Sequence, residues 1–400
     1  MRPEKAEGPK HTERLYYLDW LRVLAVLGVF YAHTAEIFDT LYWHIRQDGR
    51  GTDWNALATS GAQWGMSLFF LLAGASAWFA LSSKTSNQFI GERFKRLLIP
   101  FIVAFILLSP IQAYFIARTS SLHADNFLVF LPAFFLNIHI GWDPEWLAAY
   151  GYHLWFLAFL YVISMLALPL ILYLKRERGL QFISRLAAFC NRPAGLFVFV
   201  LPIALIQIML RAPFPGYHGW TDFFSWFLIF VYGFILLADS RFENAIEKQG
   251  KLALFVGILC VLLMLVANVA GVLSHWEHAN SYSVAYIFYW LLLSTTSWSM
   301  IVAVLYIGMR FLNFSNKVIH YANEAVLPFY ILHQPLIVII AFYMLSWPLP
   351  PGVKYLVIST TALIATLVLY ELLIRRIKIS RWLFGMKTSQ LLQLEHTLQS

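Results

Sequence analysis

Long runs of apolar residues recur along this chain of 400 residues, and short polar connectors separate them. An α-helix needs about 20 mainly apolar residues to cross the hydrocarbon core of a bilayer. The pattern therefore predicts an all-α fold, a polytopic membrane helix bundle of about ten transmembrane helices. The predicted spans are residues 15–36, 56–82, 97–117, 148–173, 194–211, 222–238, 252–274, 283–309, 325–346 and 353–374.

One further apolar segment is too short to span. Residues 127–139 read FLVFLPAFFLNIH and contain a proline. A run of this length is typical of an interfacial or re-entrant piece. We expect it to lie in a long loop on the outer side.

The composition agrees with a membrane protein. Hydrophobic residues make up 60% of the chain and charged residues 12%, whereas soluble domains are about 25% charged. The two cysteines, Cys190 and Cys260, provide no disulfide framework and match no metal-binding spacing. His275 and His278 lack the spacing of a helical zinc pair. We therefore expect no metal site and no permanently bound cofactor.

Lysine and arginine are distributed unevenly over alternate connectors. Membrane proteins concentrate these residues on the cytoplasmic side. With the N-terminus inside, 23 of the 29 fall on the inner side and five on the outer side, and Arg22 lies within the first run. This predicts cytoplasmic tails at 1–14 and 375–400 around a membrane domain at 15–374. Most of the positive residues then lie on the cytoplasmic side of the lipid bilayer, so the net charge of +8 gives no reason to expect nucleic acid as a partner.

The first apolar run carries four polar residues that a membrane helix should disfavour: Asp19, Arg22, His33 and Glu36. At 100° per residue, all four fall on one face of the helix. Arg22 and His33 are separated by about 16 Å along the axis. Such residues mark functional sites inside membrane bundles. The alternative is that Asp19 and Arg22 anchor one interface, and His33 and Glu36 the other.

A basic cluster enters the third apolar run from the cytoplasmic side. It consists of Arg93, Lys95 and Arg96, just before Pro100. Guanidinium groups bind phosphate bidentately, so this cluster suits a nucleotide-bearing cytoplasmic ligand. The positive-inside rule explains the same residues without a ligand.

Two further segments contain candidate site residues. His153 and Trp155 open the fourth long run on the outer side, where an aromatic belt also occurs. His333 lies mid-run, next to Pro335, which frees a backbone carbonyl, and Asn323 lies near the start of that run. A buried histidine that is satisfied by hydrogen bonds is the alternative for His333.

These motifs together resemble the acyltransferase-3 family of integral membrane acyltransferases. The matching segments are Leu18–Arg22 with His33, Phe69–Gly74, Arg93 and Arg96 with Pro100, and Tyr330–Pro335. His153–Leu157, Tyr370–Glu371 and Leu383–Gly385 look most like the branch of osmoregulated periplasmic glucan succinyltransferases. Members of the family commonly have a serine before the glycine of the second span, which is Gly74 here. This chain has Ala73 at that position, with Ser76 three residues later.

The resemblance implies transfer of an acyl group, with succinyl as our first expectation, from cytoplasmic acyl-CoA to hydroxyls of a periplasmic glucan or another glycan. Arg93, Lys95 and Arg96 would hold the coenzyme phosphates. Arg22 would neutralise or orient the donor. His33 would act as general base, or alternatively as a transient acyl carrier.

The remaining residues would then belong to the catalytic helix or to the acceptor side. Asp19 would belong to the catalytic group, and Glu36, His153, Trp155, His333 and Asn323 to the acceptor side or the lining. The expected location is the bacterial inner membrane, and the sequence does not indicate an oligomeric state. A succinyl carboxylate needs one spare cation, for which the outer arginines Arg46, Arg50, Arg118 and Arg211 are candidates.

Two other functions stay open at this point. One is O-acetylation of a surface polysaccharide or lipopolysaccharide. The other is a transporter or flippase for a sugar-linked substrate, in which Arg22 and His33 would line the pathway.

Overall fold

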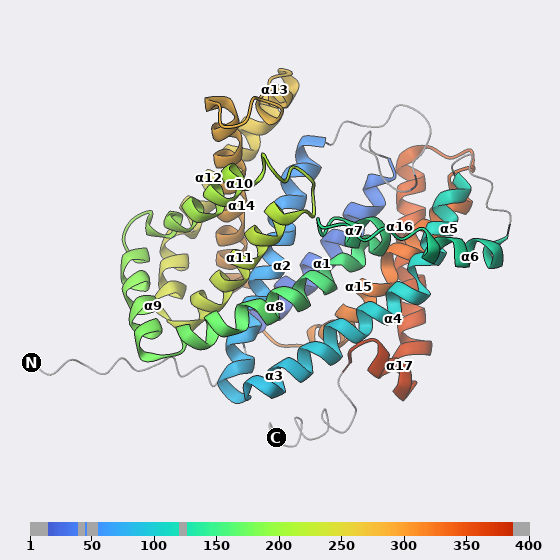
Figure 1. Cartoon of the computed structure of the whole chain (residues 1–400), viewed down its shortest axis with the longest axis horizontal. Helices are drawn as coiled ribbons and strands as arrows, with labels where there is room; N and C mark the ends of the chain where they lie inside the picture. The colour runs from blue at the N-terminus through green and yellow to red at the C-terminus, as the bar shows by residue number, and fades with distance from the viewer. Residues whose placement is uncertain (1–14, 39–44, 46–54, 120–125, 387–400) are drawn as a thin grey trace, which may run out of the picture. The chain divides into compact units, whose positions relative to one another are not determined.

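The computed structural model describes residues 15–38, 45, 55–119 and 126–386, without the side chains of 55–63. The regular secondary structure in these ranges is helical throughout, with no strand (Figure 1). The all-α membrane fold is therefore confirmed. The N-terminal tail, Arg46, Arg50 and the C-terminal tail from residue 387 onward lie outside the described residues.

Eight of the ten predicted spans are helices long and apolar enough to cross a membrane within the described part of the chain. This pattern is that of a multi-pass membrane protein. The eight segments are Trp64–Ser83, Ser86–Thr119, Trp146–Leu174, Trp220–Ala238, Arg241–Val269, Val284–Phe311, Lys317–Met344 and Pro351–Ile374.

The other two predicted spans are helical but differ from this pattern. Helix α1 (Tyr16–Glu36) has 21 residues, but its polar stripe lowers its mean hydropathy. The predicted span 194–211 begins as a 3₁₀ segment, η3 (Gly195–Phe199), and continues as the short α10 (Val200–Leu210). The segment at 127–139 forms α6 (Phe127–Leu136), which is also short.

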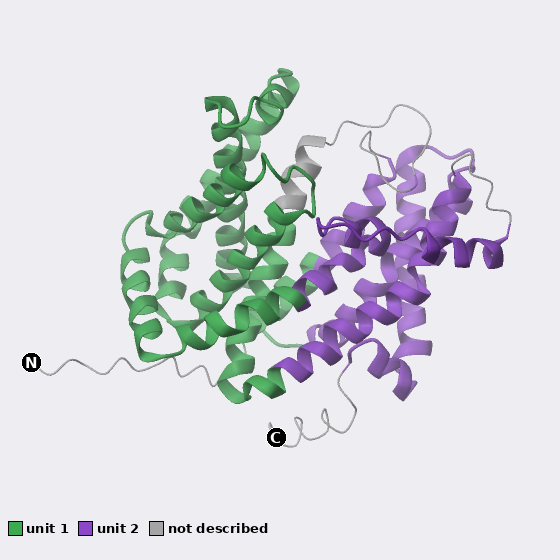
Figure 2. Cartoon of the chain, viewed as in Figure 1, with its two compact units in different colours: residues 1–25, 56–89, 162–316 green, residues 26–55, 90–161, 317–400 purple. Residues whose placement is uncertain are grey.

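The described chain divides into two compact units, which Figure 2 shows in different colours. Unit 1 comprises residues 1–25, 56–89 and 162–316, and unit 2 comprises 26–55, 90–161 and 317–400. Three helices contribute several residues to each unit: α1, α3 (Ser86–Arg93) and α8 (Trp155–Leu174).

Each unit has further helices of its own. Those of unit 1 are α2 (Asn55–Ser83), α9 (Glu177–Cys190), α10, α11 (Trp220–Ala238), α12 (Arg241–Val269), α13 (Leu273–Glu277) and α14 (Val284–Phe311). Those of unit 2 are η1 (Phe94–Leu98), α4 (Ile99–Leu107), α5 (Ser109–Thr119), α6, α7 (Trp146–Gly151), η2 (Tyr152–Leu154), α15 (Lys317–Met344), α16 (Pro351–Leu369), η4 (Tyr370–Ile374) and α17 (Lys378–Leu383).

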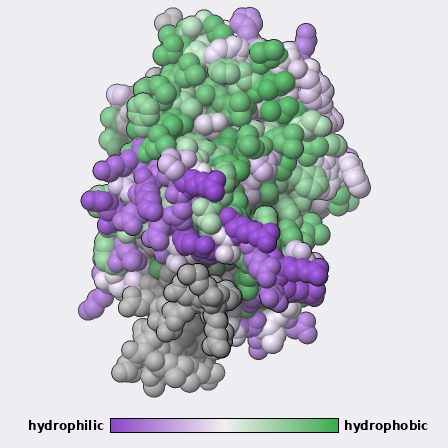
Figure 3. Space-filling model, turned by 90° about the vertical axis from the view of Figure 1, so that its left-hand side faces the viewer, coloured by the Kyte–Doolittle hydropathy of each residue, from purple (hydrophilic) through white to green (hydrophobic). Residues whose placement is uncertain are grey.

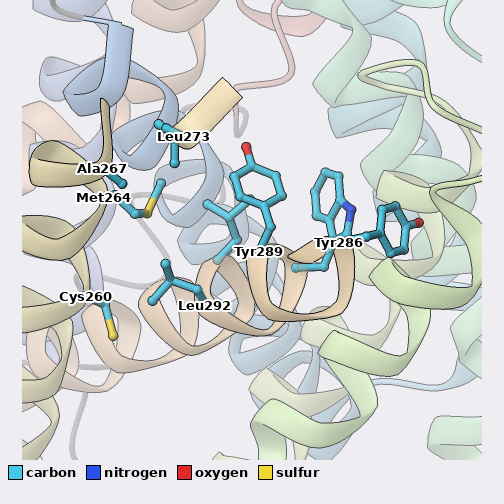
Figure 4. Packing of buried hydrophobic residues seen from close by; sticks show 9 residues of the cluster. Cys260, Met264, Ala267, Leu273, Tyr286, Tyr289 and Leu292 are labelled. Atoms are coloured by element: carbon cyan, nitrogen blue, oxygen red, sulfur yellow. The ribbon is translucent and has the colours of Figure 1, made fainter. Parts of the chain in front are cut away.

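The core of unit 1 contains an apolar cluster between α12, α13 and α14 (Figure 4). Met264 of α12 and Tyr289 of α14 are almost fully buried in it. Elsewhere in this unit α2 and α11 approach each other closely. A Cβ atom at Gly74 would collide with the carbonyl oxygen of Phe230, and one at Gly233 with that of Leu71. Small residues allow such close packing between membrane helices.

Apolar side chains also cover much of the outside of unit 1. Helix α12 exposes Phe255, Leu259, Leu262 and Val266 by half or more of their surface. Figure 3 shows one face on which apolar side chains gather above a band of hydrophilic ones. An apolar exterior of this kind suits contact with lipid.

Aromatic and aliphatic packing holds the helices of unit 2 together. Helix α5 lies along α15, where the rings of Phe115 and Phe342 are 5.2 Å apart. Helix α16 also packs on α15. A second buried cluster joins Leu332 of α15 to Tyr370 and Ile374 of η4. Helix α15 is thus central to unit 2, and it carries His333.

Candidate active site

Arg22 lies in unit 1, where Ser76 and Asp19 are among its partners. Its guanidinium donates a hydrogen bond of 2.8 Å to the Ser76 hydroxyl and one of 3.4 Å to the Asp19 carboxylate. Ser76 in turn donates to the Leu72 carbonyl at 2.8 Å, which fixes the orientation of its hydroxyl. Within this unit α1 is anchored by Trp20, whose indole N–H donates to the Phe314 carbonyl at 3.0 Å. The arginine is therefore held in a polar network that joins α1 to α2.

His33 lies in unit 2 and meets two other predicted residues. Its Nδ1 is 2.8 Å from a carboxylate oxygen of Glu36, and its ring stacks on that of His333 at 5.6 Å between centroids. An ionised carboxylate only accepts hydrogen bonds, so Nδ1 carries the proton in this pair. The Nε2 atom of His33 is then the proton acceptor of the ring.

His333 is fully buried in α15 and contacts a third histidine. Its ring lies 5.0 Å from that of His153, with the planes at 75°. Its Nδ1 lies 2.6 Å from the Tyr330 carbonyl, which can only accept, so Nδ1 is protonated. Among the described residues its Nε2 has no hydrogen-bond partner. The ring therefore presents an unused acceptor to the interior of unit 2.

His153 is fixed by a carbonyl that a proline leaves unpaired. Pro335 has no N–H group, so the carbonyl of Ile331, four residues earlier, lacks its helical donor. The Nε2 atom of His153 lies 3.1 Å from this oxygen. The Tyr330 hydroxyl also donates to the His153 carbonyl. The structure thus brings His33, His153 and His333 together in one unit.

The basic cluster lies on α3 and η1, within unit 2. Arg93 ends α3, and Lys95 and Arg96 are exposed on η1, a single π-helical turn. Such turns occur frequently at functional sites. Gly385, with a φ of +69°, lies against this turn, and a Cβ atom there would come within 2.9 Å of the Arg96 carbonyl oxygen. The segment after α17 therefore packs directly against the basic turn.

Asn323 and Trp155 are the remaining predicted residues. Asn323 is ten residues before His333 on α15, which corresponds to about 15 Å along the helix. Trp155 is buried, and its ring packs edge-on against that of Phe159 at 5.2 Å.

Comparison with known proteins identifies the family. Residues 15–371 match the family model of an acyltransferase domain, which covers nearly the whole chain. The chain belongs to the acyltransferase-3 family. Comparisons with curated proteins and with solved structures gave no match. The protein is therefore a membrane acyltransferase.

In this acyltransferase two polar side chains contribute that the sequence alone did not single out. Ser76 binds Arg22, and Tyr330 holds His153. Each had a weak signal: Ser76 follows the helix-two glycine by two residues, and Tyr330 lies in the same segment as His333.

The structure also corrects one candidate for a spare outer cation. Arg211 is 7% exposed and forms a buried ion pair with Asp222 through two nitrogen atoms. Its charge is therefore balanced inside the acyltransferase. Arg118 of α5 is exposed and lies over the rings of Tyr114 and Phe342 at 5.8 and 5.3 Å. It forms no ion pair with the described residues.

Proposed function

We propose that this acyltransferase moves a succinyl group from cytoplasmic acyl-CoA to hydroxyls of a periplasmic glucan or other glycan, in a bacterial inner membrane. The observation that carries the proposal is the histidine cluster of unit 2, in which Glu36 holds Nδ1 of His33. A neutral imidazole in this state is a general base for a hydroxyl group.

The reaction follows from that geometry. Nε2 of His33 takes the proton of the acceptor hydroxyl while the oxygen attacks the thioester carbonyl. The carbon–sulfur bond then breaks, and the proton passes to the leaving thiolate, which gives the ester and free coenzyme A. Glu36 stabilises the imidazolium that forms between these steps. Arg22 would neutralise negative charge on the donor.

The basic turn supports the choice of donor. Lys95 and Arg96 are exposed, and Arg93 is half-buried beside them. Coenzyme A carries several phosphate groups, and arginine binds these in a planar, bidentate manner. A cytoplasmic donor with phosphates therefore suits this part of unit 2.

Arg118 supports an acidic acyl group. It is an exposed cation in the same unit as His33, and no carboxylate of the described residues pairs with it. A succinyl group has a free carboxylate that such a guanidinium can bind. An acetyl group does not, so transfer of acetyl to a surface polysaccharide is the second candidate.

The test uses purified full-length protein, succinyl-CoA and a periplasmic glucan. Release of coenzyme A thiol should require the glucan, and mass spectrometry of the product should show the added succinyl group. The variant His33→Ala should lose transfer by at least about 100-fold, because general-base catalysis contributes on the order of 10²–10⁴. Arg22→Ala should lose a similar factor, because removal of one group that stabilises developing charge costs on the order of 10²–10³. His139→Ala is the matched control, since His139 is an exposed histidine of unit 2.

Three outcomes would contradict the proposal. Wild-type transfer rates in well-folded His33→Ala protein would show that His33 is not the general base. An acetyl product with acetyl-CoA, and none with succinyl-CoA, would favour the O-acetyltransferase. Flux of a lipid-linked sugar across liposomes without any thioester would indicate a transporter or flippase.

A further inference from the structure

Unit 1 contains a cavity that the proposed reaction does not use. Helices α2, α10, α11 and α14 surround a space of about 30 Å³. A water molecule needs about 10–15 Å³ measured in this way, so the space holds about two waters or two hydroxyl groups. Its lining includes Ser67, Gln207, Ser225, Trp226, Ser294 and Ser297.

The charge next to this cavity is balanced. Asp222 lines it, but both carboxylate oxygens of Asp222 accept hydrogen bonds from Arg211. The backbone N–H of His218 donates to the same carboxylate at 3.0 Å. An anion would face this carboxylate, and a cation would meet a carboxylate whose charge Arg211 already balances. The cavity therefore suits a neutral group.

The hydroxyl groups in the cavity have hydrogen-bonding capacity to spare. Ser225 and Ser294 each donate to a carbonyl of their own helix, at 2.9 and 2.7 Å. Ser225 also accepts from the Gln207 amide at 3.0 Å, so one lone pair of Ser225 and those of Ser294 are available as acceptors. Ser297 is 7% exposed, and its hydroxyl has no hydrogen-bond partner among the described residues. As a lining residue, Ser297 offers both a donor and acceptors to a neutral ligand in this cavity.

Aromatic rings complete the lining. Trp226 is buried, whereas Tyr217 is 42% exposed and lies in the connector between α10 and α11. Their rings are 6.4 Å apart at 78°. Aromatic rings pack against apolar faces, such as those of sugar rings. The edge of an aromatic ring carries partial positive charge, so polar groups can lie next to it. The cavity thus combines neutral hydroxyl recognition with an aromatic surface that reaches the outside of unit 1.

We propose that this cavity is a carbohydrate subsite, which takes the hydroxymethyl arm of a neutral sugar whose ring packs on Tyr217. The cavity admits the arm and excludes the ring because of its size. The proposal rests on the proposed function in one respect, the choice of a glycan as the ligand. A polymeric acceptor offers many sugar units, so that one can bind here while another is acylated.

Binding of a β-glucan oligosaccharide to the purified full-length protein, without any acyl donor, tests the proposal. We expect Ser297→Leu, which fills the cavity, to raise the dissociation constant about tenfold or more, because the hydrogen bonds of the arm are lost. Ser297→Ala, which preserves the volume, should raise it a few-fold. Ser299→Ala is the matched control, since Ser299 is a buried serine of the same helix that does not line the cavity.

A second arm uses the 6-deoxy form of the same oligosaccharide, which should bind wild-type protein about as weakly as the intact sugar binds Ser297→Leu. Unchanged affinity in folded Ser297→Leu, or equal affinity for the two sugars, would overturn the proposal. So would the absence of oligosaccharide binding to an enzyme that still acylates glucan. Loss of acyl transfer with retained binding would instead count against the proposed reaction alone.

Discussion

Replacement of Glu36 by glutamine tests the central geometry of the site. The carboxylate lies 2.8 Å from Nδ1 of His33 and fixes the proton on that nitrogen. A glutamine of the same size keeps the shape but removes the charge that stabilises the imidazolium, and its amide can pair with either tautomer of the ring. The variant should therefore reduce the ability of Nε2 to act as a base without changing the packing.

The magnitude follows from the exposure of the pair. A hydrogen bond to a charged group contributes about 1.5–3 kcal/mol. The side chains of His33 and Glu36 are 22% and 34% exposed, so water screens part of this interaction and the lower value applies. A loss of about 1.5 kcal/mol in the transition state corresponds to roughly a tenfold fall in kcat.

The assay is thioester-dependent acyl transfer to glucan by purified Glu36→Gln protein. We expect kcat to fall about tenfold, with unchanged KM for the donor and an unchanged midpoint of thermal unfolding. Glu371→Gln is the control, because Glu371 forms its ion pair with Arg375 on η4. A wild-type kcat in Glu36→Gln, or an equal fall in Glu371→Gln, would show that Glu36 does not position His33.

Three further predictions concern other parts of the molecule. Asp222→Asn should lower the free energy of unfolding by about 3–5 kcal/mol, because it leaves the buried Arg211 without its counter-charge; thermal unfolding in detergent measures this, and an unchanged midpoint would contradict it. Gly385→Ala should lower the free energy of unfolding by about 1–2 kcal/mol because of the positive φ. It should also raise KM for the donor by displacing the Arg96 turn, and an unchanged KM would show that Gly385 does not affect donor binding. Burial lowers the pKa of His218 from 6.5 to about 3. Between these two pH values the unfolded chain binds a proton at His218 and the folded chain does not, so the free energy of unfolding should decline as the pH falls from 6.5 towards 3. Acid titration of His218→Gln should show a smaller decline, and an identical decline would assign the effect to other groups.

The helices could largely be predicted from the sequence because their signal is local. A membrane span requires only length and apolar composition, and eight of ten predicted spans meet both conditions in the described chain. The span at 194–211 fails for a local reason that composition does not show. Ala194 has a φ of +57°, and the next five residues form a 3₁₀ segment, so the α-helical part is only 11 residues long.

The site could be predicted only as far as helical periodicity reaches. Periodicity places Asp19 beside Arg22, and Glu36 beside His33, and the structure has both pairs. It cannot show that Ser76, 54 residues away, binds Arg22. Such contacts depend on how helices pack, which the spacing within one helix does not determine.

Pro335 shows how a local rule and a distant partner combine in this site. The missing N–H of a proline frees a carbonyl four residues earlier, and the sequence alone predicts that Ile331 needs another donor. The buried interior of a membrane protein offers no water to supply it, so a side chain must do so. His153 meets this demand with Nε2. Because a carbonyl accepts only, this bond commits the Nε2 proton of His153 and leaves its buried Nδ1 as an acceptor with no hydrogen bond among the described residues. Of the three histidines, His33 is the one whose Nδ1 is paired with a carboxylate, and we propose it as the general base because that carboxylate stabilises the imidazolium.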